Sequence, residues 1–337
     1  MEFLFEYGLF VAKAITVVIA IVAVVGLIIG LASKQKGGGG NLSFDSISEQ
    51  FDNIKRQSEQ VLLSKEALKK LQKQRKKEQK KDKEETKPNL YVIDFQGSPM
   101  AKEVDSLRRE ITAILCVAKE NDEVLVKVDS GGGVVHGYGL AASQLQRIKD
   151  ANLKLTVSVD KIAASGGYMM AAVADTIISA PFAIVGSIGV VAQIPNIHKV
   201  LKKNDVDIEM HTAGEYKRTL TVLGENTEQG REKFKQELQE VHDLFKGHIK
   251  HFRSELDLEK VATGEYWLGQ KALELGLVDK LQTSDDFLLK ANDTHKLFKL
   301  KYENKKNMAQ KLGFAASTAI ESVFDKLMSM INLSRFQ

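Results

Sequence analysis

The chain has 337 residues, of which 43% are hydrophobic and 27% charged, and its formal net charge is +4. This balance is typical of a globular protein with one large domain or two modest ones, and it is too weakly basic to indicate a nucleic-acid partner by itself. The single cysteine, Cys116, cannot form an intrachain disulfide, and its apolar surroundings predict a small buried side chain.

The N-terminal region contains an uncharged stretch, residues 14–32, made almost entirely of Ile, Val, Ala, Leu and Gly. At about 1.5 Å of rise per residue this stretch spans about 28 Å, close to the thickness of a bilayer core. Glu2 and Glu6 precede it and only Lys13 is basic there, which does not fit the basic start of a signal peptide. The sequence therefore predicts an uncleaved transmembrane anchor over residues 9–33.

The charges beside this anchor bear on its orientation. Lys34 and Lys36 follow it directly, and the positive-inside rule then places the C-terminal side in the cytoplasm. The rule weakens where a long domain follows, because large domains translocate largely regardless of charge.

Residues 34–88 combine a hinge with a basic segment. Gly37–Gly40 predicts a flexible hinge. Between Lys55 and Lys87 there are 13 Lys or Arg and 6 Asp or Glu, without interleaved aromatic residues. This pattern favours anionic lipid over nucleic acid as a partner, with a solvated face as the simpler interpretation. Apolar residues at helical spacing predict an amphipathic helix or a coiled coil: Phe44, Ile47, Phe51, Ile54, Val61, Leu62, Leu68 and Leu71.

Residues 89–290 have the alternating pattern of an α/β domain. Strands are predicted at Leu90–Phe95, Val124–Val128 and Lys154–Val159, and helices at Lys102–Lys119 and Tyr138–Lys149. Because strands and helices alternate at short spacing, we expect a largely parallel sheet.

Three later segments extend the prediction. Residues 176–197 carry no charge, but Pro181, Pro195 and several glycines favour buried strands joined by tight turns over a second membrane span. Residues 227–253 predict a long polar helix capped by Thr227. Residues 291–337 predict a helical tail, because apolar residues recur at helical spacing from 312 to 331.

Two small-residue motifs follow predicted strands. Ser165, in the sequence Ala-Ala-Ser-Gly-Gly-Tyr, stands where a strand gives way to a helix, a position that suits an acyl-enzyme nucleophile. The local sequence alone favours a helix cap, because Ser-Gly-Gly is common in turns. Residues 129–133, Asp-Ser-Gly-Gly-Gly, lack the phosphate-loop and dinucleotide patterns, which leaves an oxyanion-hole donor or a plain tight turn.

A nucleophilic serine needs a base. None of the seven histidines has an obviously catalytic setting, and His242, His248 and His251 on the polar helix predict solvated side chains. A lysine is a base only where burial or a nearby positive charge keeps it neutral, and spacing does not reveal which lysine does so.

Five motifs in order give the chain a family resemblance over residues 89–285. They are residues 129–135 (DSGGGVV), 163–168 (AASGGY), 185–190 (VGSIGV), 215–219 (EYKRT) and 264–280 (GEYWLGQKALELGLVDK). Each motif is weak alone, but the set resembles the signal peptide peptidase A family, and the N-terminal anchor with its basic segment is similar to that of an inner-membrane member.

The resemblance implies a fold similar to ClpP and crotonase, built from repeated ββα units, and a serine peptidase domain at residues 89–290. It implies that Ser165 attacks a peptide carbonyl, that Lys217 takes its proton, and that Ser187 helps to hold the lysine amine. Gly132 and Gly166 match the oxyanion donors. The family usually shows Asn-Ser-Pro-Gly-Gly, and this chain departs from it with a glycine where proline is expected, which loosens that turn.

The resemblance also implies partners and location. It implies short or unfolded apolar polypeptides as substrates, an assembly of several subunits, no cofactor and no metal. It places the catalytic domain on the periplasmic side of a bacterial inner membrane, against the charge count. A catalytically silent scaffold is the alternative, although a scaffold needs neither Ser165 nor Lys217. An acyl-CoA enzyme on the related fold gives that pair no role.

Overall fold

A computed structural model of the protein describes residues 13, 16, 40–81 and 87–303. Apart from Lys13 and Thr16, the predicted anchor at residues 9–33 lies outside these residues, as does residue 304 onward of the predicted tail. Within the described part of the chain, no helix combines the length and the apolar character needed to cross a bilayer. Residues 42–302 form one compact unit.

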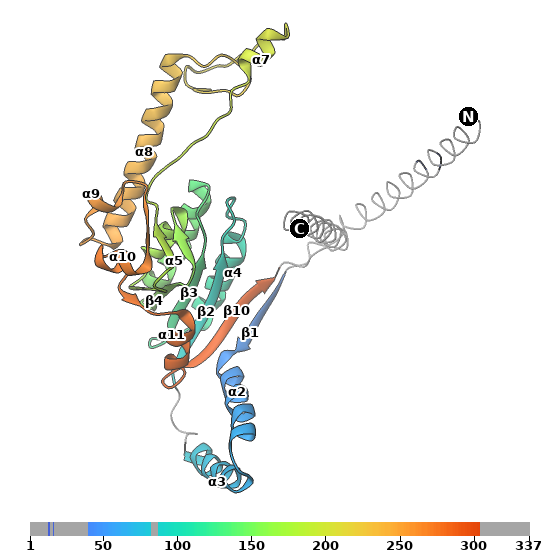
Figure 1. Ribbon diagram of the computed structural model, residues 1–337, viewed down its shortest axis with the longest axis vertical. Coiled ribbons are helices and arrows are strands. Elements are labelled where there is room, and N and C mark those ends of the chain that lie inside the picture. The colour runs from blue at the N-terminus through green and yellow to red at the C-terminus, as the bar shows by residue number, and fades with distance from the viewer. Residues whose placement is uncertain (1–12, 14–15, 17–39, 82–86, 304–337) are drawn as a thin grey trace, which may run out of the picture. The chain divides into compact units, whose positions relative to one another are not determined.

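The unit is built on a large sheet with the strand order β1-β10-β2-β3-β4-β6-β9. Its strands are β1 (Asn41–Ser46), β2 (Asn89–Gln96), β3 (Glu123–Asp129), β4 (Lys154–Val159), β6 (Thr176–Ser179), β9 (Lys280–Leu281) and β10 (Lys296–Glu303). From β10 to β9, every neighbouring pair is parallel. Figure 1 shows β10 between β1 and β2, so both ends of the unit's chain meet at one edge of the sheet. The predicted α/β class is confirmed.

A second, small sheet has the order β5-β7-β8. Its strands are β5 (Ile162–Ala164), β7 (Ile184–Gly186) and β8 (Tyr266–Leu268). β5 and β7 are parallel, and β7 and β8 are antiparallel. This sheet lies next to the junctions that carry the family motifs.

Helices connect these strands. They are α2 (Ile47–Leu62), α3 (Lys65–Lys81), α4 (Val104–Val117), α5 (Val135–Asp150), α6 (Gly166–Ala171), α7 (His198–Lys203), α8 (Glu228–Phe252), α9 (Leu258–Val261), α10 (Gly269–Glu274) and α11 (Ser284–Ala291). The long polar helix begins as the sequence predicts, because the Thr227 hydroxyl accepts a hydrogen bond from the Gly230 amide.

Alternation along β2 divides the core between the two faces of the sheet. Tyr91, Ile93 and Phe95 belong to the main core with α4 and α5. Leu90 and Val92 face the other way, into a smaller cluster with the first residue of α2 and with α11. The strand is therefore buried on both faces over most of its length.

β5, β8 and β9 are short strands that were not predicted, and two further unpredicted strands lie outside residues 89–290 and correct a proposed boundary. β1 lies in the segment expected to be helical, and β10 lies in the segment expected to be a helical tail. Both strands are fixed by pairing with the sheet rather than by a local pattern, since Leu297 and Leu300 are buried at a spacing of three. The folded unit consequently extends beyond 89–290.

The helices α2 and α3 do not form the predicted coiled coil along their apolar positions. Ile54, Val61 and Leu62 are 60%, 85% and 80% exposed. Only the first turns of α2 pack on the sheet, through Ile47 and Phe51. The prediction for Cys116 is also wrong, because the cysteine lies on the exposed side of α4.

Two buried carboxylates join distant segments. Asp122 accepts hydrogen bonds from the amides of Asn89 and Lys119. Burial alone would raise the pKa of Asp122, but these hydrogen bonds outweigh it and hold the pKa below its usual range. Glu110 on α4 accepts from the Tyr302 amide, and burial raises the pKa of its carboxyl above the usual range.

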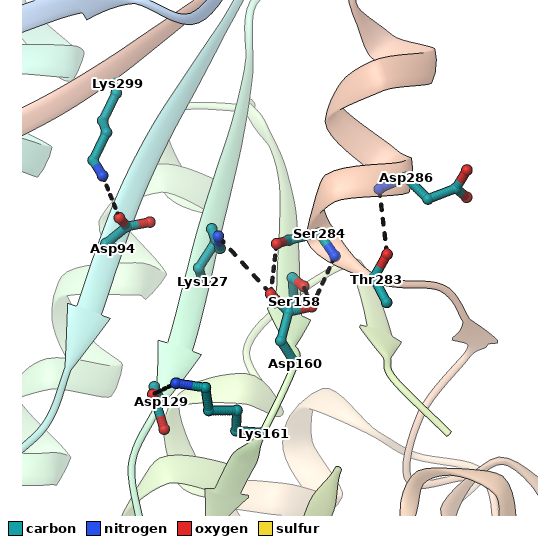
Figure 2. A network of polar contacts seen from close by, with 10 residues as sticks. All are labelled: Asp94, Lys127, Asp129, Ser158, Asp160, Lys161, Thr283, Ser284, Asp286 and Lys299. Atoms are coloured by element: carbon teal, nitrogen blue, oxygen red, sulfur yellow. Dashed lines mark hydrogen bonds and ion pairs between the residues drawn. The ribbon is translucent and has the colours of Figure 1, made fainter. Parts of the chain in front are cut away.

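Polar contacts link α11 to the end of β4 and link β10 to the neighbouring strand β2 (Figure 2). Asp160, just after β4, accepts hydrogen bonds from the amide and the hydroxyl of Ser284, at 2.8 and 2.5 Å. Lys299 of β10 pairs with Asp94 of β2 at 2.5 Å. These contacts connect the C-terminal elements to strands from much earlier in the chain.

Candidate active site

Ser165 stands at the junction between β5 and α6. Its backbone has a φ of 52° and a ψ of −118°, a region that non-glycine residues rarely adopt. The neighbouring elements hold it there, because its amide donates to the Gly186 carbonyl at 2.8 Å and its carbonyl accepts from the Met169 amide at 2.9 Å. The Ser165 side chain does not cap the helix, so the simple cap interpretation is wrong.

The glycine turn after β3 lies directly against this junction. The Ser130 amide donates to the Ile162 carbonyl, and the Ala164 amide donates to the Ser130 carbonyl, at 2.9 and 3.0 Å. At Gly132, where φ is +86°, a Cβ atom would lie 2.6 Å from the amide nitrogen of Gly166. Only glycine permits this approach.

The two predicted oxyanion donors differ in their hydrogen bonding. The Gly132 amide donates to the Ser130 hydroxyl at 3.1 Å. The Gly166 amide, the first of α6, has no hydrogen-bond partner among the residues that the structure describes. The structure therefore presents the Gly166 amide as an available donor and the Gly132 amide as an engaged one.

A buried pair of hydroxyls supports the glycine turn and was missed in the sequence. The Ser130 hydroxyl lies 2.5 Å from the Tyr138 hydroxyl, which also donates to the Ser98 carbonyl at 2.9 Å. Tyr138 is fully buried, and burial raises the pKa of its phenol. Ser130 belongs to a quoted motif, but its partner comes from the next helix and no local pattern indicates the pair.

A groove with a volume of about 860 Å³ opens beside the junction. It is lined by Pro99, Met100, residues 131–135, Tyr138, Ser165, Gly166, Met169, Ser187, residues 189–191, Val241, His242, Phe245, Thr263 and Gly264. The wall combines apolar side chains with polar groups, and Ser165 and Gly166, with its free amide, both line it. Four predicted site residues thus lie together: Gly132, Ser165, Gly166 and Ser187.

Ser187 lies on the turn after β7 and faces the same groove. Its φ is 52°, and its amide donates to the Glu265 carbonyl at 2.7 Å. Its hydroxyl reaches the Gly264 carbonyl only at 3.5 Å, the limit of a hydrogen bond. This weak bond leaves the hydroxyl oxygen able to accept a hydrogen bond from another group.

Lys217 is not brought to Ser165 within the chain. It lies in the segment 190–226, called the arm, and its side chain is exposed and absent from the groove lining. The arm exposes many large apolar side chains: Val191, Ile194, Ile197, Val200, Val206, Ile208, Met210, Tyr216, Val222 and Leu223. Residues 176–197 were predicted to form buried strands joined by tight turns. The last buried residue of this segment is Ile188, and residues 191–197 are exposed.

Two of the three histidines on α8 correct the sequence interpretation, whereas His251 is exposed as predicted. His242 lines the groove, and its Nε2 atom is buried with no hydrogen-bond partner in the described part of the chain. His248 donates from Nε2 to the Met169 carbonyl at 2.9 Å, and burial lowers the pKa of its imidazole. Both side chains are half-buried rather than fully solvated, because this face of α8 packs on α6. Helical periodicity would have identified the face through Val241, Phe245 and Ile249.

The acidic residue of the glycine motif lies away from the groove. Asp129 pairs with Lys161 at 3.6 Å on the sheet face shown in Figure 2. The described residues hold no group of three or more His, Cys, Asp or Glu side chains placed to bind a metal ion.

Comparison with known proteins agrees with the family resemblance. The model of peptidase family S49 matches residues 147–298, and that of the family's N-terminal region matches residues 2–145. "Probable protease SohB" of Haemophilus influenzae is 48% identical over 339 residues, covering 96% of each chain. The protein of the same description from Buchnera aphidicola subsp. Schlechtendalia chinensis is 62% identical over 202 residues, 60% of this chain and 66% of that one.

One solved structure is also similar. It is a mutant of the "1510-N membrane-bound stomatin-specific protease", with 17% identity and a TM-score of 0.41 over 61% of this chain and 85% of that one. The family assignment rests on the sequence matches, and they are sufficient: the chain belongs to peptidase family S49.

Proposed function

We propose that this S49 peptidase is a membrane-anchored serine peptidase in which Ser165 is the nucleophile and Lys217 is the general base. The observation that carries the proposal is the setting of Ser165. Its hydroxyl faces the groove without a hydrogen-bond partner among the described residues, and the unpaired Gly166 amide lies beside it. A strained backbone at a strand-to-helix junction is a common way to expose a nucleophile.

The chemistry follows from these groups. The Ser165 hydroxyl attacks the scissile carbonyl while a neutral lysine amine takes its proton. The Gly166 amide donates to the oxyanion of the tetrahedral intermediate, and a small shift of the Ser130 hydroxyl would free the Gly132 amide for the same task. The lysine then returns the proton to the leaving amine, and a water molecule activated by the same lysine hydrolyses the acyl-enzyme.

Lys217 reaches a serine when two copies of the chain assemble. A lysine serves as a base only where burial keeps its amine neutral, and Lys217 is exposed in the single chain. The arm that carries it exposes apolar side chains that a neighbouring subunit would cover. We infer that the arm of one copy delivers Lys217 to the groove of the next, where the weakly bonded Ser187 hydroxyl would hold the amine.

The groove favours apolar polypeptides in an extended form. Its wall includes Met100, Val134, Met169 and Phe245, with polar groups among them that can bind a peptide backbone. Short or unfolded segments, such as remnants of signal peptides, match this chemistry. The uncharged stretch at 14–32 is proposed to anchor the enzyme in a bacterial inner membrane, with the catalytic domain on the periplasmic side.

A catalytically silent scaffold is the second candidate. The observation in its favour is that a single chain does not bring Lys217 to Ser165. The scaffold hypothesis, however, gives no role to the strained backbone of Ser165 or to the free Gly166 amide.

Hydrolysis of casein by the detergent-solubilised full-length protein distinguishes the two. Ser165→Ala and Lys217→Ala are each expected to lower the rate by at least about 1,000-fold while the protein remains folded and assembled. Ser187→Ala is expected to lower it less. Lys203→Ala, at another exposed lysine of the arm, is the matched control and keeps wild-type activity. Full activity of Lys217→Ala would show that another group is the base, and an inactive wild-type protein would favour the scaffold.

A further inference from the structure

The turn between α2 and α3 exposes a cluster of large aliphatic side chains. Val61, Leu62 and Leu63 are 85%, 80% and 38% exposed. Leu62 ends α2, and Ser64 begins α3 by accepting a hydrogen bond from the Ala67 amide at 3.3 Å. Three consecutive apolar residues at an exposed helix corner cost hydration free energy, so a surface that covers them would stabilise the corner.

The start of α3 places positive charge next to this corner. Lys65, Lys69, Lys70 and Lys73 are all exposed, and they form no ion pair with any residue in the described part of the chain. Their spacing puts them on one side of α3, while Leu68 and Leu71 lie half-buried on the other. Glu59, an acidic side chain in the last turns of α2, is already engaged by Arg75 at 2.6 Å.

We propose that the α2–α3 turn, defined as residues 61–64, inserts its aliphatic side chains into a bilayer that contains anionic phospholipid. The aliphatic residues match the boundary between headgroups and acyl chains, and the exposed lysines match the negative charge of the headgroups. This contact is independent of the Ser165 chemistry. It gives the folded unit its own hold on the lipid surface, apart from any transmembrane segment.

The charge pattern favours lipid over other occupants. A second copy of the chain would bring the same exposed lysines against one another, and like charges disfavour a self-complementary contact. Nucleic acid would use the lysines but would give no role to Val61, Leu62 and Leu63, and no aromatic side chain is present at the corner for base stacking.

Spin labelling of the full-length protein tests the proposal. A nitroxide is attached at Leu62→Cys in a Cys116→Ser background, since Cys116 is the chain's single cysteine. The protein is reconstituted into phosphatidylcholine vesicles with or without phosphatidylglycerol, and power saturation compares access of oxygen and of a water-soluble nickel complex. Leu289→Cys is the control, because Leu289 is a 61% exposed leucine on α11.

With phosphatidylglycerol, the label at position 62 is expected to become several-fold more accessible to oxygen than to nickel, while the label at 289 remains accessible to nickel. Substituting the four lysines by glutamine is expected to return the label at 62 to water. Persistent nickel access at 62 in the anionic vesicles would overturn the proposal. Dipolar broadening between labels at 62 would also overturn it, because such broadening indicates contact between copies of the chain. The same holds if the label inserts equally well without phosphatidylglycerol and after the lysine substitutions.

Discussion

Replacing Ser165 by glycine or by alanine separates the backbone strain of this residue from the chemistry of its hydroxyl. Both variants lack the nucleophile and are expected to be inactive. Alanine keeps the penalty of a φ of 52° with a ψ of −118°, whereas glycine adopts this conformation without strain. The two variants should therefore differ in stability although both are catalytically inactive.

The magnitude follows from two opposing terms. Relief of the strain is worth about 1–3 kcal/mol, and the greater freedom of glycine in the unfolded chain removes about 0.5–1 kcal/mol of it. Ser165→Gly should then be more stable than Ser165→Ala by about 0.5–2 kcal/mol. For a folded unit of this size the melting temperature should rise by about 1–5 °C.

The assay is thermal unfolding of the detergent-solubilised proteins, followed by circular dichroism at one scan rate. Ser143 in α5 supplies the control, because its backbone is helical and its side chain is exposed. There the order reverses, and Ser143→Gly should be less stable than Ser143→Ala by roughly 1 kcal/mol. If glycine is no more stable than alanine at position 165, the claim of stored strain at the nucleophile is wrong.

Three further substitutions test the site and its support. Gly132→Ala places a methyl group against the Gly166 amide at a positive φ, so activity should be lost and stability should fall by at least about 2 kcal/mol. Gly139→Ala is the control and should be tolerated in both assays, because the space around Gly139 is open. Glu110→Gln should raise stability by roughly 1 kcal/mol above neutral pH. The pKa of the buried Glu110 carboxyl is raised, so the wild-type protein loses stability as pH rises from about 4.5. A variant that is no more stable than wild type at pH 8 would contradict this. Asp122→Ala should lower the free energy of unfolding by about 2–3 kcal/mol at pH 7, measured by denaturant unfolding. This difference should shrink as pH falls below about 3.8, because the pKa of Asp122 is lowered and its carboxylate stabilises the fold only while it is ionised.

The sequence predicts the centre of the fold well because those elements carry local patterns. The strand at Leu90–Phe95 and the helix capped by Thr227 appear within one or two residues of their predicted bounds. The sequence does not predict β1 and β10, because strands of mixed polarity are defined by their partners in the sheet, which lie many residues away in the chain.

The candidate site divides in the same way. Ser165 can be placed at a strand-to-helix junction from its neighbours alone, and the resemblance adds Gly132, Gly166 and Ser187 to one groove. The contact between Ser130 and Tyr138 and the position of His242 depend on how helices pack, which no local motif encodes. The geometry of Lys217 depends on an arm with little packing of its own, and a single chain leaves its partner undefined.

The most direct test of the central claim is complementation between the two inactive variants. Ser165→Ala and Lys217→Ala are co-expressed, purified as mixed assemblies, and assayed on casein beside each variant alone. If Lys217 of one subunit serves Ser165 of the next, random mixing in a closed ring restores about a quarter of wild-type activity, because some sites combine an intact serine with an intact lysine. If the mixed assemblies remain as inactive as the separate variants, Lys217 does not act across a subunit boundary and the proposed site is wrong.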